Sequence, residues 1–180
     1  WDILITKNPP KPVGKIVAGG MLRQGTPIQH YPEYGLWVKR EDLSCPSPGP
    51  HFSKARGVYA WVKKQDAELI GVLDTRHSQA GHAVARACQI LGKQCLNFYP
   101  DYKGEPGPKE PQRRAEKLGA TLYPLPAGRS CILYHAAKKE TLRRGGVMIP
   151  NALKLNESVE ETAKECPRTH SFDVVLVPAS

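Results

Sequence analysis

Residues 69–99 read LIGVLDTRHSQAGHAVARACQILGKQCLNFY, and this stretch decides the fold. It begins with a short apolar run at 69–74, which predicts a buried strand. Residues 80–91 then place small and apolar side chains at helical spacing, and Gly92 is a typical helix stop. A second apolar run at 95–99 predicts the next strand. A strand, a helix and a strand in this order indicate two parallel strands joined by a crossover helix.

The same alternation extends in both directions along the chain. It predicts strands at 36–39, 121–123, 147–149 and 172–177, helices at 53–65, 111–118, 130–144 and 157–165, and a Pro/Gly-rich loop at 101–111. The sequence therefore predicts an α/β protein with a parallel sheet flanked by helices on both faces. Ligands of such sheets bind at the carboxyl ends of the strands. We expect the site among the loops that follow Val38, Leu73, Phe98, Val147 and Leu176.

Composition narrows the class of protein further. The 26 Lys and Arg residues exceed the 17 Asp and Glu residues, and the net charge of +9 favours anionic partners without choosing among phosphate, carboxylate and nucleic acid. No apolar run is long enough for a membrane span, and the N-terminal residues lack the layout of a signal peptide, so we expect a cytoplasmic protein. The five scattered cysteines favour free thiols over a disulfide framework or a metal site.

Lys54 is the first candidate for chemistry. The segment WVKREDLS at 37–44 is followed by a Pro/Gly-rich loop and then by FSKARG at 52–57, which puts Lys54 at the first turn of a predicted helix. The helix dipole disfavours a cation there and favours the neutral amine, the nucleophilic form of lysine. A solvated lysine that happens to precede a helix explains the same letters, so the residues alone leave both interpretations open.

The segment DTRHSQAGHAVA at 74–85 is the second candidate, because it joins the predicted strand to the predicted helix. Small residues at Ala80 and Gly81 let a ligand approach the backbone closely, and the free N–H groups of a helix N-terminus bind anions. Ser78 is equally explained as a plain helix N-cap. His77 and His82 are more simply interpreted as ordinary surface or core histidines.

In this order and spacing, WVKREDLS and FSKARG resemble the opening of the β-family of enzymes that depend on pyridoxal 5′-phosphate (PLP). This family is tryptophan synthase β-like, of fold type II, and includes threonine synthase, threonine and serine dehydratases, cysteine synthase, D-cysteine desulfhydrase and aminocyclopropane-carboxylate deaminase. ILGKQCLNFYP at 90–100, RRAEKLGATLYPL at 113–125 and SFDVVLVPAS at 171–180 resemble its following elements.

The resemblance implies a two-lobed fold, of which this chain would hold about the first half. The chain would stop before the glycine loop that binds the cofactor's phosphate. Residues 1–64 and 171–180 would belong to the larger lobe. Residues 65–170 would form a smaller lobe with a four-stranded parallel sheet.

The resemblance also implies residue roles. Lys54 would form a Schiff base with the cofactor, PLP, and act as the base at the substrate's α-carbon. Gln79 stands where the family has an asparagine that contacts the cofactor's 3′ oxygen, and this departure would shift the ring. Ser78 would assist proton transfer. The substrate carboxylate would be held by the helix N-terminus, at Ser78, Gln79, Ala80, Gly81 and His82.

The implied function is a PLP-dependent enzyme that acts on an amino acid or a similar substrate by elimination, deamination or β-replacement, as a homodimer. The branch stays open, because the loop before Lys54 resembles the desulfhydrase and deaminase branch while KARG at 54–57 resembles threonine synthase. The alternative is a non-catalytic basic α/β domain that binds an anionic partner such as nucleic acid. A PLP enzyme with a polyanionic substrate would combine the two. The glycine motifs of nucleotide-binding doubly wound domains are absent from the sequence.

Overall fold

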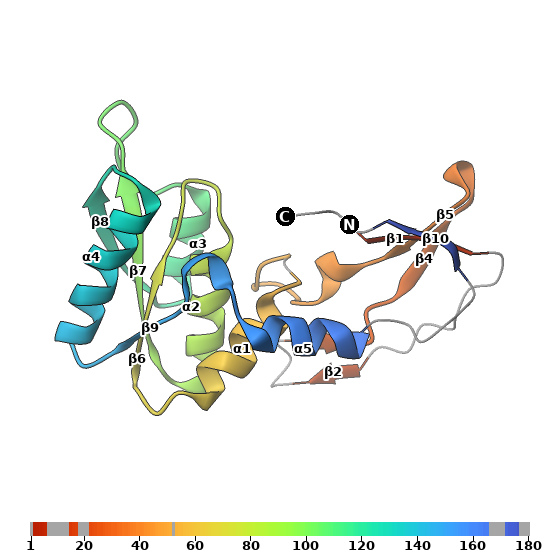
Figure 1. Cartoon of the computed structure of the whole chain (residues 1–180), viewed down its shortest axis with the longest axis horizontal. Helices are drawn as coiled ribbons and strands as arrows, with labels where there is room; N and C mark the ends of the chain where they lie inside the picture. The colour runs from red at the N-terminus through yellow and green to blue at the C-terminus, as the bar shows by residue number, and fades with distance from the viewer. Residues whose placement is uncertain (1, 7–14, 18–21, 52, 166–171, 177–180) are drawn as a thin grey trace.

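The structure is a computed structural model, and it describes residues 2–6, 15–17, 22–51, 53–165 and 172–176. Phe52 and the predicted approach to a glycine loop at 177–180 lie outside these ranges. A helix-covered sheet forms one side of the molecule in Figure 1, and a second sheet forms the other. None of the helices in the described part of the chain is long and apolar enough to cross a lipid bilayer.

The first sheet has four parallel strands in the order β8-β7-β6-β9. Its strands are β6 (Leu69–Leu73), β7 (Gln94–Asp101), β8 (Thr121–Pro126) and β9 (Val147–Met148). Three helices join them, namely α2 (Ala80–Leu91), α3 (Glu110–Lys117) and α4 (Ser130–Arg143).

Side-chain alternation along β6 explains why helices cover both faces of this sheet. Ile70 and Val72 join the core that contains α2, whereas Leu73 joins the core that contains α4. Gly71 lets α4 approach, because a Cβ there would lie 2.2 Å from Thr141 Oγ1. The predicted fold class, a parallel sheet flanked by helices, is confirmed.

The second sheet is antiparallel and has the order β10-β1-β5-β4. Its strands are β1 (Asp2–Thr6), β4 (Ile28–Tyr31), β5 (Leu36–Lys39) and β10 (Phe172–Leu176). A separate hairpin joins β2 (Lys15–Val17) to β3 (Leu22–Gln24).

This second sheet corrects the sequence analysis in two ways. The strands before residue 36 were not predicted. The expectation that the loops after Val38 and Leu176 lie at the edge of the parallel sheet is wrong, because β5 and β10 pair in the antiparallel sheet. Periodicity predicts a strand but not the strand with which it pairs. Here β1 pairs with β10, from the other end of the chain. The lobe boundaries at 64, 65, 170 and 171 stay a prediction.

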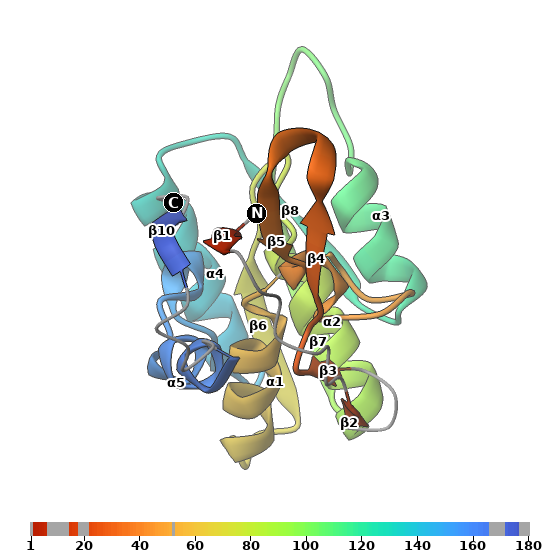
Figure 2. The ribbon, with the colours of Figure 1, turned by 90° about the vertical axis from the view of Figure 1, so that its right-hand side faces the viewer.

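Helices α1 (Ala55–Lys64) and α5 (Asn156–Glu165) lie side by side between the two sheets, as Figures 1 and 2 show. Gly57 makes this contact close, because a Cβ there would lie 2.3 Å from Ser158 Cα. Among the described residues there are also three short 3-10 helices, η1 (Pro32–Tyr34), η2 (Glu41–Leu43) and η3 (Asn151–Leu153).

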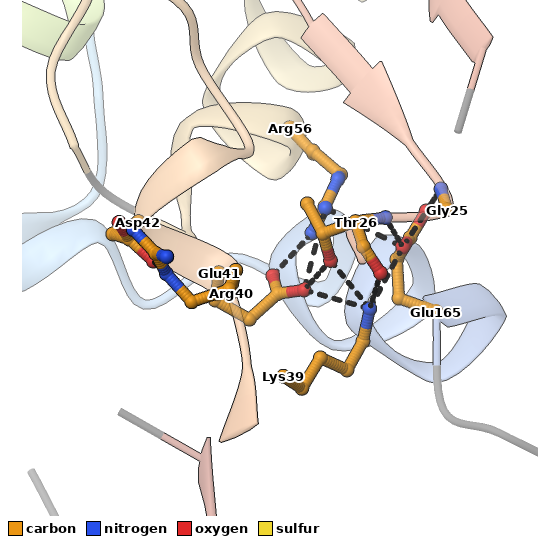
Figure 3. Close-up of polar contacts among 8 residues, drawn as sticks. All are labelled: Gly25, Thr26, Lys39, Arg40, Glu41, Asp42, Arg56 and Glu165. Atoms are coloured by element: carbon orange, nitrogen blue, oxygen red, sulfur yellow. Dashed lines mark hydrogen bonds and ion pairs between the residues drawn. The ribbon is translucent and has the colours of Figure 1, made fainter. Parts of the chain in front are cut away.

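A buried ion network, formed by Lys39, Glu41, Arg56 and Glu165, ties α1 and α5 to the antiparallel sheet (Figure 3). Lys39 Nζ lies 3.0 Å from Glu41 Oε1 and 3.2 Å from Glu165 Oε2. Arg56 reaches the same two carboxylates at 2.6 Å and 3.4 Å. Glu165 also accepts hydrogen bonds from the N–H groups of the turn at 25–26.

Within the part of the chain that the structure describes, the network pairs two cations with two carboxylates. Burial raises the pKa of Glu41, but hydrogen bonds from Arg56 and Thr26 and the nearby positive charges outweigh burial, so its pKa lies below the ordinary 4.5. Glu41 therefore stays ionised and keeps both cations paired. Because Arg56 lies on the first turn of α1, the network also fixes where that helix begins.

Glu41→Gln should lower the free energy of unfolding by about 3–5 kcal/mol, because it removes a carboxylate that both buried cations, Lys39 and Arg56, contact. Urea unfolding measures this loss, and Glu140→Gln, which breaks exposed pairs, is the matched control and should change little. The folded pKa of Glu41 is depressed, so its contribution is present above pH 4.5 and is lost as the pH falls further. A Glu41→Gln protein as stable as the parent would contradict this account.

Candidate active site

A cavity of about 320 Å³ opens where β6 ends, between η3 and the first turns of α1, α2 and α4. It lies at the carboxyl end of a parallel strand, as the sequence predicted for the loop after Leu73. The cavity brings together three of the predicted site residues, Lys54, Ser78 and Ala80. Its lining is Lys54, Leu73, Thr75, Ser78, Ala80, Ser130, Asn151, Ala152 and Leu153.

Lys54 occupies the N-cap position of α1, with φ −64° and ψ −9°. Its carbonyl accepts a hydrogen bond from Val58 N–H at 2.9 Å, so the helix holds its backbone. The neighbouring Ala55 is fully buried, whereas Lys54 itself is half-buried. The backbone of Lys54 is therefore held in place, and its side chain can direct the amine into the cavity.

A side chain in the loop before α2 hydrogen-bonds to the backbone N–H of the first residue of that helix. Ser78 Oγ accepts a hydrogen bond from Ala80 N–H at 3.0 Å, but the N-cap of α2 is Gln79, so the interpretation of Ser78 as the helix N-cap is wrong by one residue. The carboxylate of Asp74 packs against the same turn, because a Cβ on Gly81 would lie 2.6 Å from Asp74 Oδ2. A substrate carboxylate at this helix terminus would have to displace one of these contacts, so the carboxylate role of residues 78–82 stays a prediction.

Gln79 is turned toward His82. His82 Nε2 lies 2.8 Å from the carbonyl oxygen of Pro48, and because a carbonyl only accepts, this nitrogen carries the hydrogen. His82 Nδ1 lies 3.3 Å from Gln79 Oε1, and with the ring hydrogen on Nε2 this contact becomes a hydrogen bond when the Gln79 amide turns its NH₂ group to Nδ1. Burial lowers the pKa of His82, so the ring is neutral. The contact of Gln79 with the cofactor ring oxygen stays a prediction, and the cavity lining does not include Gln79.

Three polar lining residues were missed by sequence reasoning, namely Thr75, Ser130 and Asn151. Asn151 follows the strand at 147–149, whose loop was already expected at the edge of the sheet. The next residue, Ala152, has φ +56°, a left-handed conformation that a non-glycine residue rarely adopts. Such strain is concentrated at functional sites, and only the structure reveals it.

The cavity suits a small ring that carries an aldehyde and polar substituents. Its volume lies within the range of small-ligand sites. Lys54 offers an amine for the aldehyde, the hydroxyls and the Asn151 amide offer hydrogen bonds, and Leu73 and Leu153 offer an apolar surface. The residues present therefore fit the ring and the aldehyde of PLP.

Solved structures share this architecture. The crystal structure of an ACC deaminase homologue matches 81% of this chain and 49% of its own, with a TM-score of 0.64 and 18% identity. The threonine deaminase of T.th. matches 63% of this chain and 34% of its own, with a TM-score of 0.51 and 16% identity. At such identities the likeness shows the fold alone. The chain has the fold of the fold type II PLP-dependent enzymes.

A curated protein of Pseudomonas phage M6, named glycyl-dTMP PLP-dependent decarboxylase, is 49% identical over 157 residues. The match covers 83% of this chain and 56% of that relative, so the chain spans little more than half of the relative's length. No family model matches the chain. The family resemblance stated from the sequence is confirmed by this relative and by the fold.

Gly81→Ala should destabilise the loop before α2. A Cβ at this position would lie 2.2 Å from Asn97 Nδ2 and 2.6 Å from Asp74 Oδ2, both of them buried. We expect a loss of roughly 1–3 kcal/mol from overpacking, measured by urea unfolding. The matched control is Gly104→Ala, because a Cβ there meets nothing within 4 Å. Equal stability of the two variants would refute the close packing beneath α2.

Proposed function

We propose that the intact protein is a PLP-dependent decarboxylase that attaches its cofactor through Lys54 and acts on an amino-acid group carried by a nucleotide. The observation that carries this proposal is the cavity in which Lys54 and Ser78 meet at the carboxyl end of β6. The amine of Lys54 is the nucleophile that the cofactor's aldehyde requires. Its place at the start of a helix fixed by Arg56 supports this role.

PLP, when bound, draws electrons from the substrate's α-carbon and so weakens the bonds to that atom. The chain's own residues then orient the substrate and handle protons. Ser130 and Asn151 offer hydrogen-bonding groups from the α4 and η3 side of the cavity, and Thr75 and Ser78 offer them from the α2 side. Leu73 and Leu153 supply apolar contacts that help to exclude water.

The reaction differs from those that the family resemblance implied. Elimination, deamination and β-replacement were expected, whereas the 49% identical relative is named a decarboxylase. All these reactions share the lysine amine and differ in which bond to the α-carbon breaks. Loss of CO₂ leaves a carbon that must take up a proton, and Ser78 places a hydroxyl in the same cavity as Lys54.

The substrate class rests on charge as well as on the relative. The name of the relative contains dTMP, a phosphate-bearing nucleotide, and this chain carries a net charge of +9 that attracts anions. This combines the two expectations of an amino-acid substrate and an anionic partner. The non-catalytic alternative gains no support from relatives that are PLP-dependent enzymes. A homodimer, as the family resemblance implies, is part of the proposal.

Lys54→Ala in the full-length protein should abolish covalent attachment of PLP. Borohydride reduction followed by peptide mass mapping should place the label on Lys54 of the parent and on no residue of the variant. The matched control is Lys63→Ala on the exposed face of the same helix, which should keep the label. A label on another lysine would show that Lys54 is not the attachment site.

Release of CO₂ from glycyl-dTMP should accompany attachment of PLP to Lys54, and Lys54→Ala should abolish it. Glycine is the comparison substrate, and it should react poorly because it lacks the nucleotide. Release of ammonia without CO₂ would replace decarboxylation with deamination and leave the cofactor assignment intact. No turnover of either substrate by the labelled enzyme would refute the proposed substrate class.

A further inference from the structure

A second cavity, of about 230 Å³, lies beside the first turn of α2 and is not used by the proposed function. It is bordered by the loop at 47–51, by His82 of α2 and by the C-terminal end of α3. Figure 2 shows this loop, which precedes α1, reaching the C-terminal end of α3. Ala80 lines the Lys54 cavity and His82 lines this one, and residues two apart on an α-helix point about 200° apart. The two cavities therefore lie on opposite sides of α2.

The lining of the second cavity is rich in nitrogen. Four of its side chains, His51, His82, Arg114 and Lys117, carry nitrogen, and no carboxylate lines it among the described residues. Such a lining attracts anions. The volume is smaller than that of most sites for whole small molecules, which favours a compact anionic group.

Three of these side chains keep nitrogen atoms that a ligand can use. Lys117 is exposed, and its ammonium group has no hydrogen-bond partner within the part of the chain that the structure describes. Arg114 donates from Nε to Glu110 Oε1 at 3.0 Å, which leaves the terminal NH₂ groups of its guanidinium. His51 Nδ1 donates to the carbonyl oxygen of Asp42 at 3.0 Å, so Nε2 is the ring nitrogen that remains.

The wall of the cavity is held in place before any ligand binds. His82 Nε2 donates to the carbonyl oxygen of Pro48 at 2.8 Å and so ties the loop to α2. Gly49 N–H donates to the carbonyl oxygen of Pro46 at 2.9 Å, and a Cβ on Gly49 would lie 2.2 Å from Cys45 Sγ. The loop is therefore closely packed, and binding does not have to order it.

The electrostatics of His82 agree with a positive cavity. Burial is the largest cause that lowers the pKa of His82, and its backbone hydrogen bond opposes this change. Positive charge on Arg114, on protonated His51 and on Arg86 lowers the pKa further. An anion in the cavity would be attracted by the same charges.

We propose that this cavity binds a phosphate group, and that Arg114, Lys117 and His51 hold it. Phosphate offers several oxygens to donors that come from two elements, the loop and α3. A carboxylate has two oxygens, which one guanidinium can satisfy alone. The site goes beyond the proposed function and does not depend on it. Because the two cavities lie on opposite sides of α2, we expect the phosphate to belong to a ligand other than the occupant of the Lys54 cavity.

NMR of the full-length protein with isotope-labelled histidine tests the site directly. The protein is loaded with PLP, so that inorganic phosphate does not enter the site of the cofactor's phosphate. Inorganic phosphate, titrated at constant pH and ionic strength, should shift the ring signals of His51 until they saturate. Lys117→Gln and Arg114→Gln should each weaken this binding roughly tenfold, because each removes a charge-assisted hydrogen bond.

Arg113→Gln is the matched control, because Arg113 is exposed on the same helix and does not line the cavity. It should bind phosphate as the parent does. The absence of a saturating shift, or equal weakening by Arg113→Gln, would overturn the proposal. Acetate at the same ionic strength is the second comparison, and binding as tight as that of phosphate would refute the phosphate class.

The deoxynucleotide dTMP identifies the source of the phosphate. If the phosphate belongs to a separate ligand, the His51 signals should stay in place at dTMP concentrations that compete with glycyl-dTMP in decarboxylation. If dTMP shifts these signals and Lys117→Gln weakens that shift roughly tenfold, the cavity holds the phosphate of the substrate itself. The titration with inorganic phosphate needs no turnover. It therefore decides the phosphate site even where PLP fails to attach to Lys54 and the proposed function is wrong.

Discussion

Four buried charges hold the described structure together, and the candidate site depends on them. Removing a charge from water is costly, so Lys39, Glu41, Arg56 and Glu165 are tolerated only because each faces opposite charges. Glu165 lies at the far end of α5, so the network closes only when α5 packs on α1. The same closure fixes the start of α1 and hence the backbone of Lys54.

The candidate active site lies at the carboxyl end of β6. This strand is buried on both faces, with α2 on one side and α4 on the other, so the N-termini of both helices border the space beyond its last residue. Polar groups gather there because strand ends and helix starts leave backbone groups without regular partners. Asp74 accepts from one of them, Thr75 N–H, and also from the side chain of Gln112, and so holds the start of the loop that carries Ser78.

The buried charges of the ion network are paired, whereas the excess of positive charge lies elsewhere in the chain. The buried network contains two cations and two carboxylates, so it contributes nothing to the net charge of +9. The excess of positive charge therefore belongs to the rest of the chain, which includes exposed residues such as Lys63 and Lys138. This distribution supports a phosphate-bearing substrate, because long-range attraction requires charges that are not already paired.

The parallel sheet and its helices could be predicted from the sequence alone, because apolar periodicity and helix stops are local signals. The same signals placed Lys54 at the start of a helix. The antiparallel sheet was decided by tertiary structure, since β1 finds β10 at the other end of the chain and short strands carry little local signal. Packing between separate elements also set the contact of Gln79 with His82, the inclusion of Asn151 in the cavity, and the hydrogen bond from Gln112 to Asp74. Each depends on side chains from separate elements, whose meeting is set by packing and not by spacing along the chain.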